Sequence, residues 1–465
     1  MTFPCQGQWW LPGTQNKRVF GTLTFTRRDG AMLSLADTLS VGSDDPETDI
    51  IVGQTAGGGY VTLLHAIRTA APVFRLTPTF PCSYHAPLVI TGAAFDSRAD
   101  VRFSLWQIRF PELKTWAGKH GFEIESSELF AGRDCPAVQI AYNTPPRQVL
   151  ARDAGGSDLS LGYWPLLKTD PHMATVRQDV YLEVRQPNRD TLEDYMQTAT
   201  RFEHFLTLAT GSLVRTGSIK AIVRTDDTGV TNGPILVDIL HQPIRNAPRR
   251  KRPGTEKLLY TLPDIAGREE DCFKNWFTKA DWLDPVCALY FGTLYNPSRY
   301  LELNFLTLIQ AVEAYHRRAS DETDRPPDEH AARMKAILDA APAEHRDWLG
   351  EKLRYSNELS LRRRLKLLFA QFSYLLDDLI LDGKATVGDI CDNRNYLTHY
   401  DATLKSRAAS GTRLLLLVEV LKLLLQACFL GELGLPDAKI KEFISRSRSV
   451  QMIRHLKNRI AKPGG

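Results

Sequence analysis

The spacing of apolar residues changes along the chain, and this change limits the possible folds more than any other feature of the sequence. In residues 1–165 apolar and polar side chains alternate, as in "RVFGTLTF", which predicts strands. Asp29-Gly30 and the glycine run Gly57–Gly59 predict the turns of two hairpins. This part therefore predicts a β sandwich or barrel rather than a nucleotide-binding α/β unit.

A segment of mixed character follows in residues 166–260. "QDVYLEVRQ" has the pattern of a strand, and the next helix is expected to begin near Thr191 and to end at Gly211. In "IRNAPRRKRPG" basic residues stand among prolines and a glycine, which indicates an exposed connector. Contact of this connector with RNA phosphates is the alternative.

Residues 261–465 have a helical pattern almost throughout. Apolar residues recur at steps of three and four in "YLELNFLTLIQAVEAYHRR", and "SNELSLRRRLKLLFAQF" predicts an amphipathic helix that begins after Ser360. A leucine-rich helix over 412–433 and a last, basic helix over 437–462 complete the set. Together these elements predict an antiparallel helical bundle.

Composition excludes some classes of protein. With 58 Lys and Arg against 54 Asp and Glu the net charge is +4, so a basic partner surface must be local. The leucine-rich helix is long enough to span a membrane, but Glu419 and Lys422 favour a buried soluble helix. The N-terminus lacks the pattern of a signal peptide, so we expect no membrane partner.

The cysteines indicate a reducing environment. Seven scattered cysteines without paired C-x2-C spacing argue against a disulfide framework, so a cytoplasmic location is expected. Cys82 and His85 have half of a zinc-like spacing, with no second half nearby. An ordinary buried thiol is the simpler interpretation, and we expect neither a metal nor a cofactor.

The candidate chemistry lies in "CDNRNYLTHYD", where Arg394 and His399 form an R-x4-H pair. A second such pair, Arg325 and His330, falls in a proline-bearing stretch expected to be a loop. On a helix, His399 lies about 140° around the axis from Arg394 and roughly 7.5 Å further along it. Asn395, four residues before His399, is placed to hold the imidazole by a hydrogen bond.

One such set supplies one acid–base group and one cation. Cleavage of a phosphodiester requires one group to take a proton, one to return it, and positive charge near the non-bridging oxygens. A two-fold dimer would pair two imidazoles with two guanidinium groups, without a metal. The alternative is structural: His399 caps a core, and Arg394 pairs with a nearby carboxylate. The available carboxylates are Asp389, Asp392 and Asp401.

Other polar residues are secondary candidates. Glu313, one turn before His316, could support the site, although a surface ion pair is the alternative. Six basic residues are candidates for phosphate contacts, with solvated helix faces as the alternative. They are Arg362, Arg363, Arg364, Lys366, Arg454 and Lys457.

Several stretches, in order, resemble one family. "ALYFGTLYNPSRYLELNFLTLIQAVEAYHRR", "NELSLRRRLKLL" and "DNRNYLTHYD" resemble the Apea-like HEPN domain. "WWLPG", "GTLTF", "IIVGQTAGGGYVTLL" and "FEHFLTLATGS" resemble the N-terminal domains of bacterial ApeA anti-phage proteins. The resemblance implies a multidomain α+β protein: a β-rich ApeA-type domain (1–165), a mixed middle region (166–260) and an all-α HEPN bundle (261–465).

The resemblance also implies a function. HEPN ribonucleases carry an R-x4-6-H motif, which maps onto Arg394 and His399, with Asn395 as the polar residue after the arginine. It implies a homodimer, or higher homo-oligomer, in which His399 acts as acid or base and Arg394 stabilises the phosphate while the ribose 2′-OH attacks. That chemistry requires RNA.

The expected protein is therefore a latent endoribonuclease of anti-phage defence. It would cleave RNA, tRNA being one candidate, and stop the growth of the infected cell once a phage-derived trigger reaches the N-terminal domain. The alternative is a catalytically silent HEPN module that binds nucleotide or a protein, with the β-rich domain as the interaction surface.

Overall fold

The computed structural model describes residues 3–39, 47–70, 82–126, 138–152, 156–188, 190–223, 234–242, 258–380, 382–400 and 402–461. Its contacts divide the chain into two compact units, Met1–Phe277 and Thr278–Gly465. Strand β12 (Asp158–Asp170) runs through residue 165 and pairs within the main sheet of the first unit. The segments predicted as N-terminal and middle domains are thus joined by this strand.

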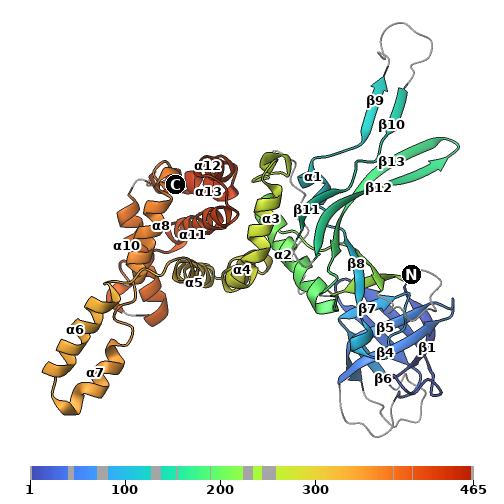
Figure 1. Ribbon diagram of the computed structural model, residues 1–465, viewed down its shortest axis with the longest axis horizontal. Coiled ribbons are helices and arrows are strands. Elements are labelled where there is room, and N and C mark those ends of the chain that lie inside the picture. The colour runs from blue at the N-terminus through green and yellow to red at the C-terminus, as the bar shows by residue number, and fades with distance from the viewer. Residues whose placement is uncertain are drawn as a thin grey trace. The chain divides into compact units, whose positions relative to one another are not determined.

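Among the described residues, the first unit consists mainly of strands, with the α-helices α1, α2 and α3 (Figure 1). Thirteen strands form one sheet in the order β11-β12-β13-β8-β14-β15-β7-β5-β4-β1-β2-β3-β6, and β9 and β10 form a separate pair. The remaining strands are β1 (Cys5–Trp10), β2 (Val19–Thr26), β3 (Gly30–Leu35), β4 (Glu47–Thr55), β5 (Tyr60–Ala70), β6 (Cys82–Ala86), β7 (Leu88–Thr91), β8 (Phe103–Ile108), β9 (Phe122–Ser126), β10 (Val138–Tyr142), β11 (Gln148–Arg152), β13 (Met173–Arg185), β14 (Ile219–Val223) and β15 (Leu236–His241).

One end of the large sheet closes into a barrel. The six strands from β5 through β6 form a ring because β6 also pairs with β5. Their inward side chains form a core around Trp9, which is fully buried. Gly53 on β4 has no side chain where one would overlap the Trp9 ring. The predicted barrel-like domain is confirmed, and both glycine turns join the strands expected from the sequence.

The rest of the sheet carries a helical layer around α2 (Leu192–Thr210). This helix begins at Thr191, whose hydroxyl accepts from the backbone N–H of Asp194, and ends at Gly211 with φ 59°, as predicted. Its side chains Phe202 and Phe205 pack with rings from α1 (Leu113–Ala117) and α3 (Glu269–Thr278). This aromatic cluster is a second core in the first unit.

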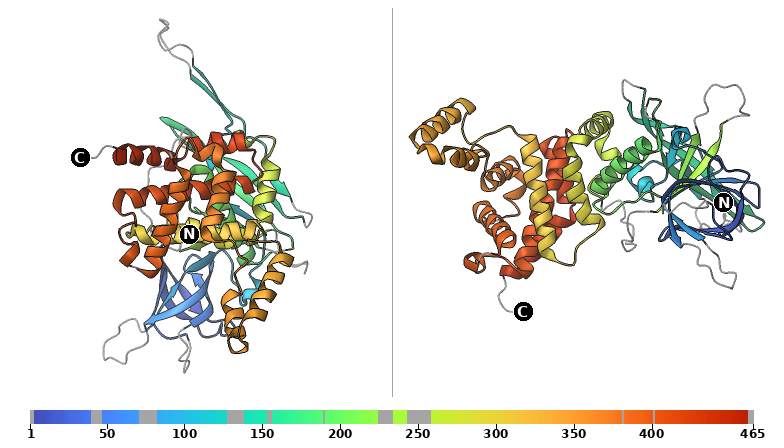
Figure 2. Two further views of the ribbon diagram at one scale, coloured as in Figure 1. Left: turned by 90° about the vertical axis from the view of Figure 1, so that its left-hand side faces the viewer. Right: turned by 90° about the horizontal axis from the view of Figure 1, so that it is seen from below.

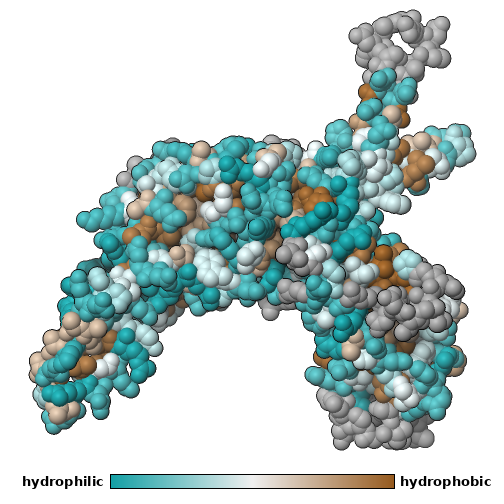
Figure 3. Space-filling view, in the orientation of Figure 1, coloured by the Kyte–Doolittle hydropathy of each residue, from teal (hydrophilic) through white to brown (hydrophobic). Residues whose placement is uncertain are grey.

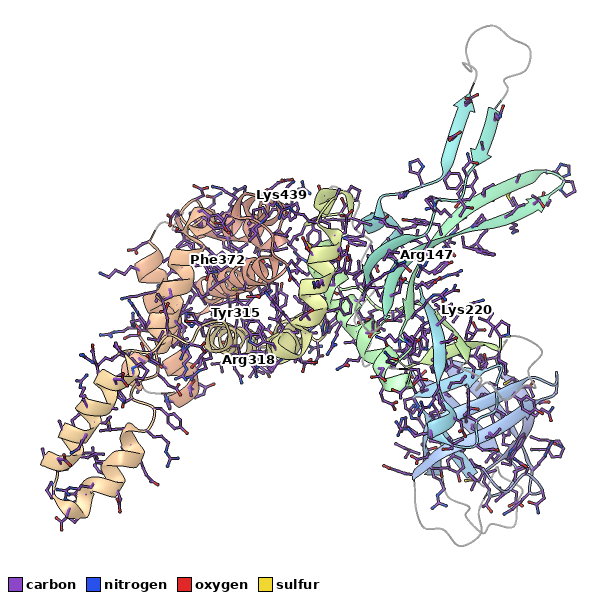
Figure 4. The ribbon with its side chains drawn as sticks, viewed as in Figure 1. Arg147, Lys220, Tyr315, Arg318, Phe372 and Lys439 are labelled. Atoms are coloured by element: carbon purple, nitrogen blue, oxygen red, sulfur yellow. The ribbon has the colours of Figure 1, made fainter. Side chains whose placement is uncertain are left out.

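Two hairpins, β9–β10 and β12–β13, project from the sheet (Figure 1). At the base of the longer one Arg147, labelled in Figure 4, forms ion pairs with Asp158 at 2.9 Å and Glu183 at 3.3 Å. Further out, apolar side chains such as Trp164 and Leu167 are exposed, and brown patches mark this hairpin in Figure 3. The charged pairs therefore hold the base, while the outer part has an amphipathic surface.

The second unit is all-helical, as predicted, and contains the HEPN-like segments of the sequence. Its helices are α4 (Ala280–Tyr295), α5 (Leu301–Ala319), α6 (Pro327–Ala340), α7 (Arg346–Leu353), α8 (Leu361–Gln371), α9 (Ser373–Leu376), α10 (Gly383–His399), α11 (Gly411–Glu432), α12 (Asp437–Ser445) and α13 (Arg448–Ala461).

Helix α11 is the central element of the bundle. It packs against α5, α12 and α13, and the right-hand view of Figure 2 shows α5 alongside it. Its length and composition would suffice to cross a membrane, but 78% of its most apolar window is buried in the bundle. Glu419 accepts from Ser449 at 2.7 Å and from Lys422 at 2.8 Å. The prediction of a buried core helix is confirmed, because its charged residues have partners inside the bundle.

Two local predictions were wrong. The expected single helix over 437–462 is broken between α12 and α13, where the fully buried Ser447 donates its hydroxyl hydrogen to Gln426 at 2.7 Å. The stretch around Arg325 and His330 is not only a loop, because α6 begins at Pro327. Proline is well suited to the first turn of a helix, where its missing N–H leaves no hydrogen bond unmade.

The α6–α7 hairpin stands apart from the core of the bundle (Figure 1). Neither α6 nor α7 contains a buried residue, and Trp348 on α7 is 61% exposed. Backbone hydrogen bonds connect its two ends, where Asp324 N donates to Asn357 O at 2.9 Å. The hairpin is therefore an appendage rather than a part of the packed core.

Candidate functional site

Helix α10 carries the candidate catalytic residues. It begins at Asp382, whose carboxylate accepts from the backbone N–H of Ala385 at 2.8 Å, and it ends with His399. The buried stripe of Val387, Ile390 and Leu397 holds the helix in the bundle, where it packs on α5 and α8. Cys391 and Asn393 are buried as well.

Arg394, Asn395 and His399 lie in the last two turns of α10. His399 and Asn395 are exposed, and Arg394 is half-buried. Arg394 Nη1 donates to Asn395 Oδ1 at 3.4 Å, whereas the predicted bond from Asn395 to His399 is not formed. A charged guanidinium is the stronger donor for the amide oxygen. The His399 ring has no hydrogen-bond partner in the part of the chain that the structure describes.

The structural alternative for this motif loses most of its support. Asp389 pairs with Arg413 at 3.2 Å, and Asp392 pairs with Arg362 at 3.6 Å. Neither carboxylate is therefore paired with Arg394, and Asp401 lies outside the described residues. His399 does not cap a core either, because its side chain is exposed.

Asn393 was not among the residues predicted to matter at this site. This residue is fully buried, and its amide donates to the Asp389 carbonyl at 2.8 Å while its Oδ1 accepts from Ala409 N at 2.8 Å. It thereby ties the segment that follows His399 back onto α10. The signal was present in the sequence, since Asn393 falls three residues after Ile390 on the apolar stripe.

Two aromatic rings lie beside the candidate pair. The rings of Tyr396 and Tyr400 have centroids 5.6 Å apart, and Tyr400 is 69% exposed. Tyr400 has φ 51°, in the left-handed region that a tyrosine rarely adopts. The helix thus stops abruptly after His399, with an exposed aromatic surface next to the imidazole.

The predicted phosphate contacts on α8 separate into two groups. Arg362, Arg363 and Lys366 are exposed, and α8 packs directly on α10. Arg364 is only 4% exposed, so the prediction that it meets RNA at the surface does not fit this structure. It belongs to the apolar face of α8, where it donates to the Leu359 carbonyl at 3.0 Å and to His316 Nδ1 at 3.2 Å.

The other two basic candidates lie on α13, which packs on α11. Arg454 is exposed. Lys457 is half-buried, and its Nζ donates to the Leu379 carbonyl at 2.8 Å. The ammonium group of Lys457 is therefore already bound to a carbonyl group within the bundle.

Helix α5 contributes two groups beneath this surface. Glu313 accepts from Arg317 at 3.0 Å, so the ion-pair interpretation describes its contact in the structure. His316 is buried, and its pKa is lowered from the ordinary value by burial and by the neighbouring charge of Arg364. A neutral imidazole leaves Nδ1 free to accept the Arg364 hydrogen bond.

The predictions about the first unit have mixed outcomes. Cys82 is buried on β6, and His85 Nε2 is 2.9 Å from the Asp29 carbonyl oxygen. Among the residues that the structure describes, no group of three or more His, Cys, Asp or Glu could hold a metal. The basic connector over 244–254 lies outside the described residues.

Comparisons with known proteins give two family matches. A model described as ApeA N-terminal domain 1 matches residues 4–276, and one described as Apea-like HEPN matches residues 306–439. The second match includes Arg394, Asn395 and His399, but not Arg454 or Lys457. The searches of curated proteins and of solved structures found no match.

Proposed function

Because the chain belongs to the ApeA family of anti-phage HEPN proteins, we propose that it is a latent, metal-independent endoribonuclease. The observation that carries this proposal is the set at the end of α10, where His399 and Asn395 are exposed beside the half-buried Arg394. An imidazole and a guanidinium at the surface are accessible to a substrate, and neither is paired with a carboxylate of the described residues.

The proposed reaction is attack of a ribose 2′-OH on the adjacent phosphate. One imidazole takes the proton of the 2′-OH, and a second returns a proton to the departing 5′-oxygen. The products are a 2′,3′-cyclic phosphate and a 5′-OH end. Arg394 stabilises the charge on the non-bridging oxygens, because its planar fork can bind two of them at once.

This mechanism needs two imidazoles, and one chain supplies only one at the motif. We therefore include a homodimer in the proposal, with the α10 ends of two subunits forming one composite site. Histidine suits both roles, because imidazole can take or return a proton near neutral pH. Arg362, Arg363 and Lys366 on the neighbouring helix would bind the RNA backbone, and Arg454 would be a separate contact.

The biological part of the proposal follows from the family. The protein would act in the bacterial cytoplasm, where the N-terminal unit restrains the nuclease until a phage-derived trigger arrives. Cleavage of RNA, tRNA among the candidates, would then stop growth before the phage is released.

The test compares RNA cleavage by the wild type, His399→Ala and His330→Ala. His399→Ala removes both acid–base groups of the composite site, so cleavage should fall by at least the roughly 10²- to 10⁴-fold that one such group contributes. His330 belongs to the second R-x4-H pair, so its variant is a matched control that should remain active. Activity should persist in EDTA, and an all-DNA copy of the substrate should not be cut. Equal cleavage by the wild type and His399→Ala would reject the assignment.

A further inference from the structure

The first unit contains a cavity whose walls are unusually basic. Its volume is about 220 Å³, and its lining includes Arg27, Arg109, Lys114 and Arg177 together with one carboxylate, Asp179. Four positive charges and one negative charge give a local net charge of +3, against +4 for the whole chain. The lining of this small hollow is therefore strongly positive.

Asp179 fixes the positions of two of these cations. It is 7% exposed, and its two carboxylate oxygens bind different arginines. Arg177 Nη2 lies 3.1 Å from Oδ1, and Arg109 Nη1 lies 3.1 Å from Oδ2. Each guanidinium keeps further N–H donors, because an arginine has five. The two forks are thus held in place before any ligand arrives, which reduces the entropy cost of binding.

The backbone of the cavity wall is also fixed. Gly217 N donates to the Arg109 carbonyl at 2.6 Å, and Arg109 N donates to the Ser218 carbonyl at 2.9 Å. A side chain at Gly217 would overlap the Arg109 carbonyl, so only glycine permits this approach. The hydroxyl and N–H of Thr216 both donate to Glu203 at 2.8 Å, which holds the same segment from behind.

Two further cations reach the cavity from other elements. Arg27 comes from the turn between β2 and β3, and its Nη1 donates to the Thr216 carbonyl at 3.5 Å. Lys114 lies on α1, is exposed, and has no ion pair among the described residues. The cations therefore converge from four separate segments, as in a built site rather than along one charged helix face.

We propose that this cavity binds the terminal phosphate of a small phosphorylated molecule. Three phosphate oxygens suit the spare donors of two fixed arginines and a lysine. A cavity of this volume is smaller than the roughly 300–1,000 Å³ of sites that enclose a whole drug-sized ligand. Its size suits a phosphate group and adjacent atoms, with the rest of the molecule extending into solvent. An internal RNA phosphate is less suitable, because it carries one charge and chain on both sides.

The test measures binding to the full-length protein by isothermal titration calorimetry. The probes are ATP, ADP, inorganic phosphate, adenosine and an oligoribonucleotide with 5′-OH ends. ATP or ADP should bind, inorganic phosphate should compete, and adenosine should not bind. Lys114→Gln and Arg177→Gln should each weaken binding about tenfold or more. Lys168→Gln removes an exposed charge on β12 outside this cavity and should leave the affinity unchanged.

Several outcomes would overturn the proposal. Equal affinity of the wild type and both cavity variants would place the ligand elsewhere, and binding of the oligoribonucleotide alone would indicate an RNA surface. These measurements do not involve RNA cleavage, so their failure is distinct from failure of the proposed nuclease.

Two further variants test whether the fixed positions of the arginines matter for binding in addition to the net charge of the cavity. Asp179→Asn raises the local net charge from +3 to +4, yet it releases the two arginines, so binding should weaken. Tighter binding would show that charge alone attracts the anion and would overturn the site. Arg177→Lys keeps the charge at an exposed position and so leaves folding intact. It should lower affinity because it loses the planar fork.

Discussion

At the scale of single residues, the buried contact between His316 and Arg364 makes the second unit sensitive to acid. The pKa of His316 is lowered in the folded state, so the unfolded chain binds the proton more readily. The stability contributed by this contact is complete above the ordinary histidine pKa of about 6.5 and is lost as pH falls below it. A protonated imidazole could no longer accept from Arg364, which would remain buried beside a second positive charge.

We therefore expect the melting temperature of the wild type to fall more between pH 7 and pH 5 than that of His316→Gln. Glutamine can accept the Arg364 hydrogen bond but does not titrate. The measurement is thermal unfolding followed by circular dichroism at both pH values. The half-buried His204 and His241 of the first unit have pKa values lowered to about 4 by desolvation, and they titrate equally in both proteins. Parallel losses of stability would rule out His316 as the acid-sensitive group.

Arg394 provides a second test at this scale. Arg394→Ala should lower kcat/KM for RNA cleavage by about 10²- to 10³-fold, since it removes a charge that stabilises the transition state. Arg394→Lys retains the charge without the planar fork, so an intermediate loss of about tenfold or more is expected. Single-turnover cleavage of a defined RNA measures both. Arg325→Lys, from the second R-x4-H pair, serves as the control; a lysine variant as active as the wild type would show that the fork is unimportant.

Individual contacts were predicted from the sequence only where one local rule decided them. Ser360 begins α8 as expected, because its hydroxyl accepts from Arg363 N within the same turn. The burial of Arg364 could not be predicted in the same way. It follows from the packing of α8 against α5. His316 on α5 lies 48 positions before Arg364 in the sequence and accepts its hydrogen bond.

At the scale of elements, α10 and the segment after it are held together by one buried amide. Asn393 is bonded at both ends of its side chain, and Ala409 N depends on it for a partner. The element that ends with His399 is therefore fixed from the inside of the bundle.

Asn393→Ala should lower the free energy of unfolding by about 1–3 kcal/mol, because it leaves a buried N–H without its partner. Asn395→Ala, at the exposed position two residues away, should change it by less than about 0.5 kcal/mol. Urea denaturation of both variants makes the comparison. If the two substitutions had equal effects, the role assigned to the buried amide would be wrong.

The ends of some helices can be predicted from the sequence, and the ends of others cannot. The bounds of α2, α5 and α11 follow from apolar spacing and from residues such as Thr191 and Gly211. The break between α12 and α13 is different, since Ser447 is not a strong helix breaker. Its bond to Gln426, made across the bundle, accounts for the position of the break.

At the scale of the whole molecule, the proposed nuclease depends on association of two chains. In a heterodimer of the wild type and His399→Ala, the shared site would keep one imidazole and lack the second proton-transfer group. Exchange with an excess of His399→Ala should therefore lower cleavage by the wild type as heterodimers form. The measurement is RNA cleavage after subunit exchange, with exchange verified by co-purification of differently tagged chains. Unchanged cleavage after verified exchange would argue against a composite site.

The fold classes of both units were predictable, because in each unit the spacing of apolar residues follows one pattern over many residues. The barrel, the bundle and the family all followed from the printed sequence. It was not predictable that residues 1–165 and 166–260 belong to one unit. This depends on the pairing of β12 with β11 and β13 across residues 148–185. Pairing partners are set by the whole sheet rather than by any one strand.

The helical hairpin α6–α7 is a suitable place to insert a reporter protein. Because it contributes no buried side chain, the bundle should fold with foreign sequence spliced into the connection between its two helices. A fluorescent protein inserted there would report where the protein gathers in a living cell during infection, while both ends of the chain stay untouched.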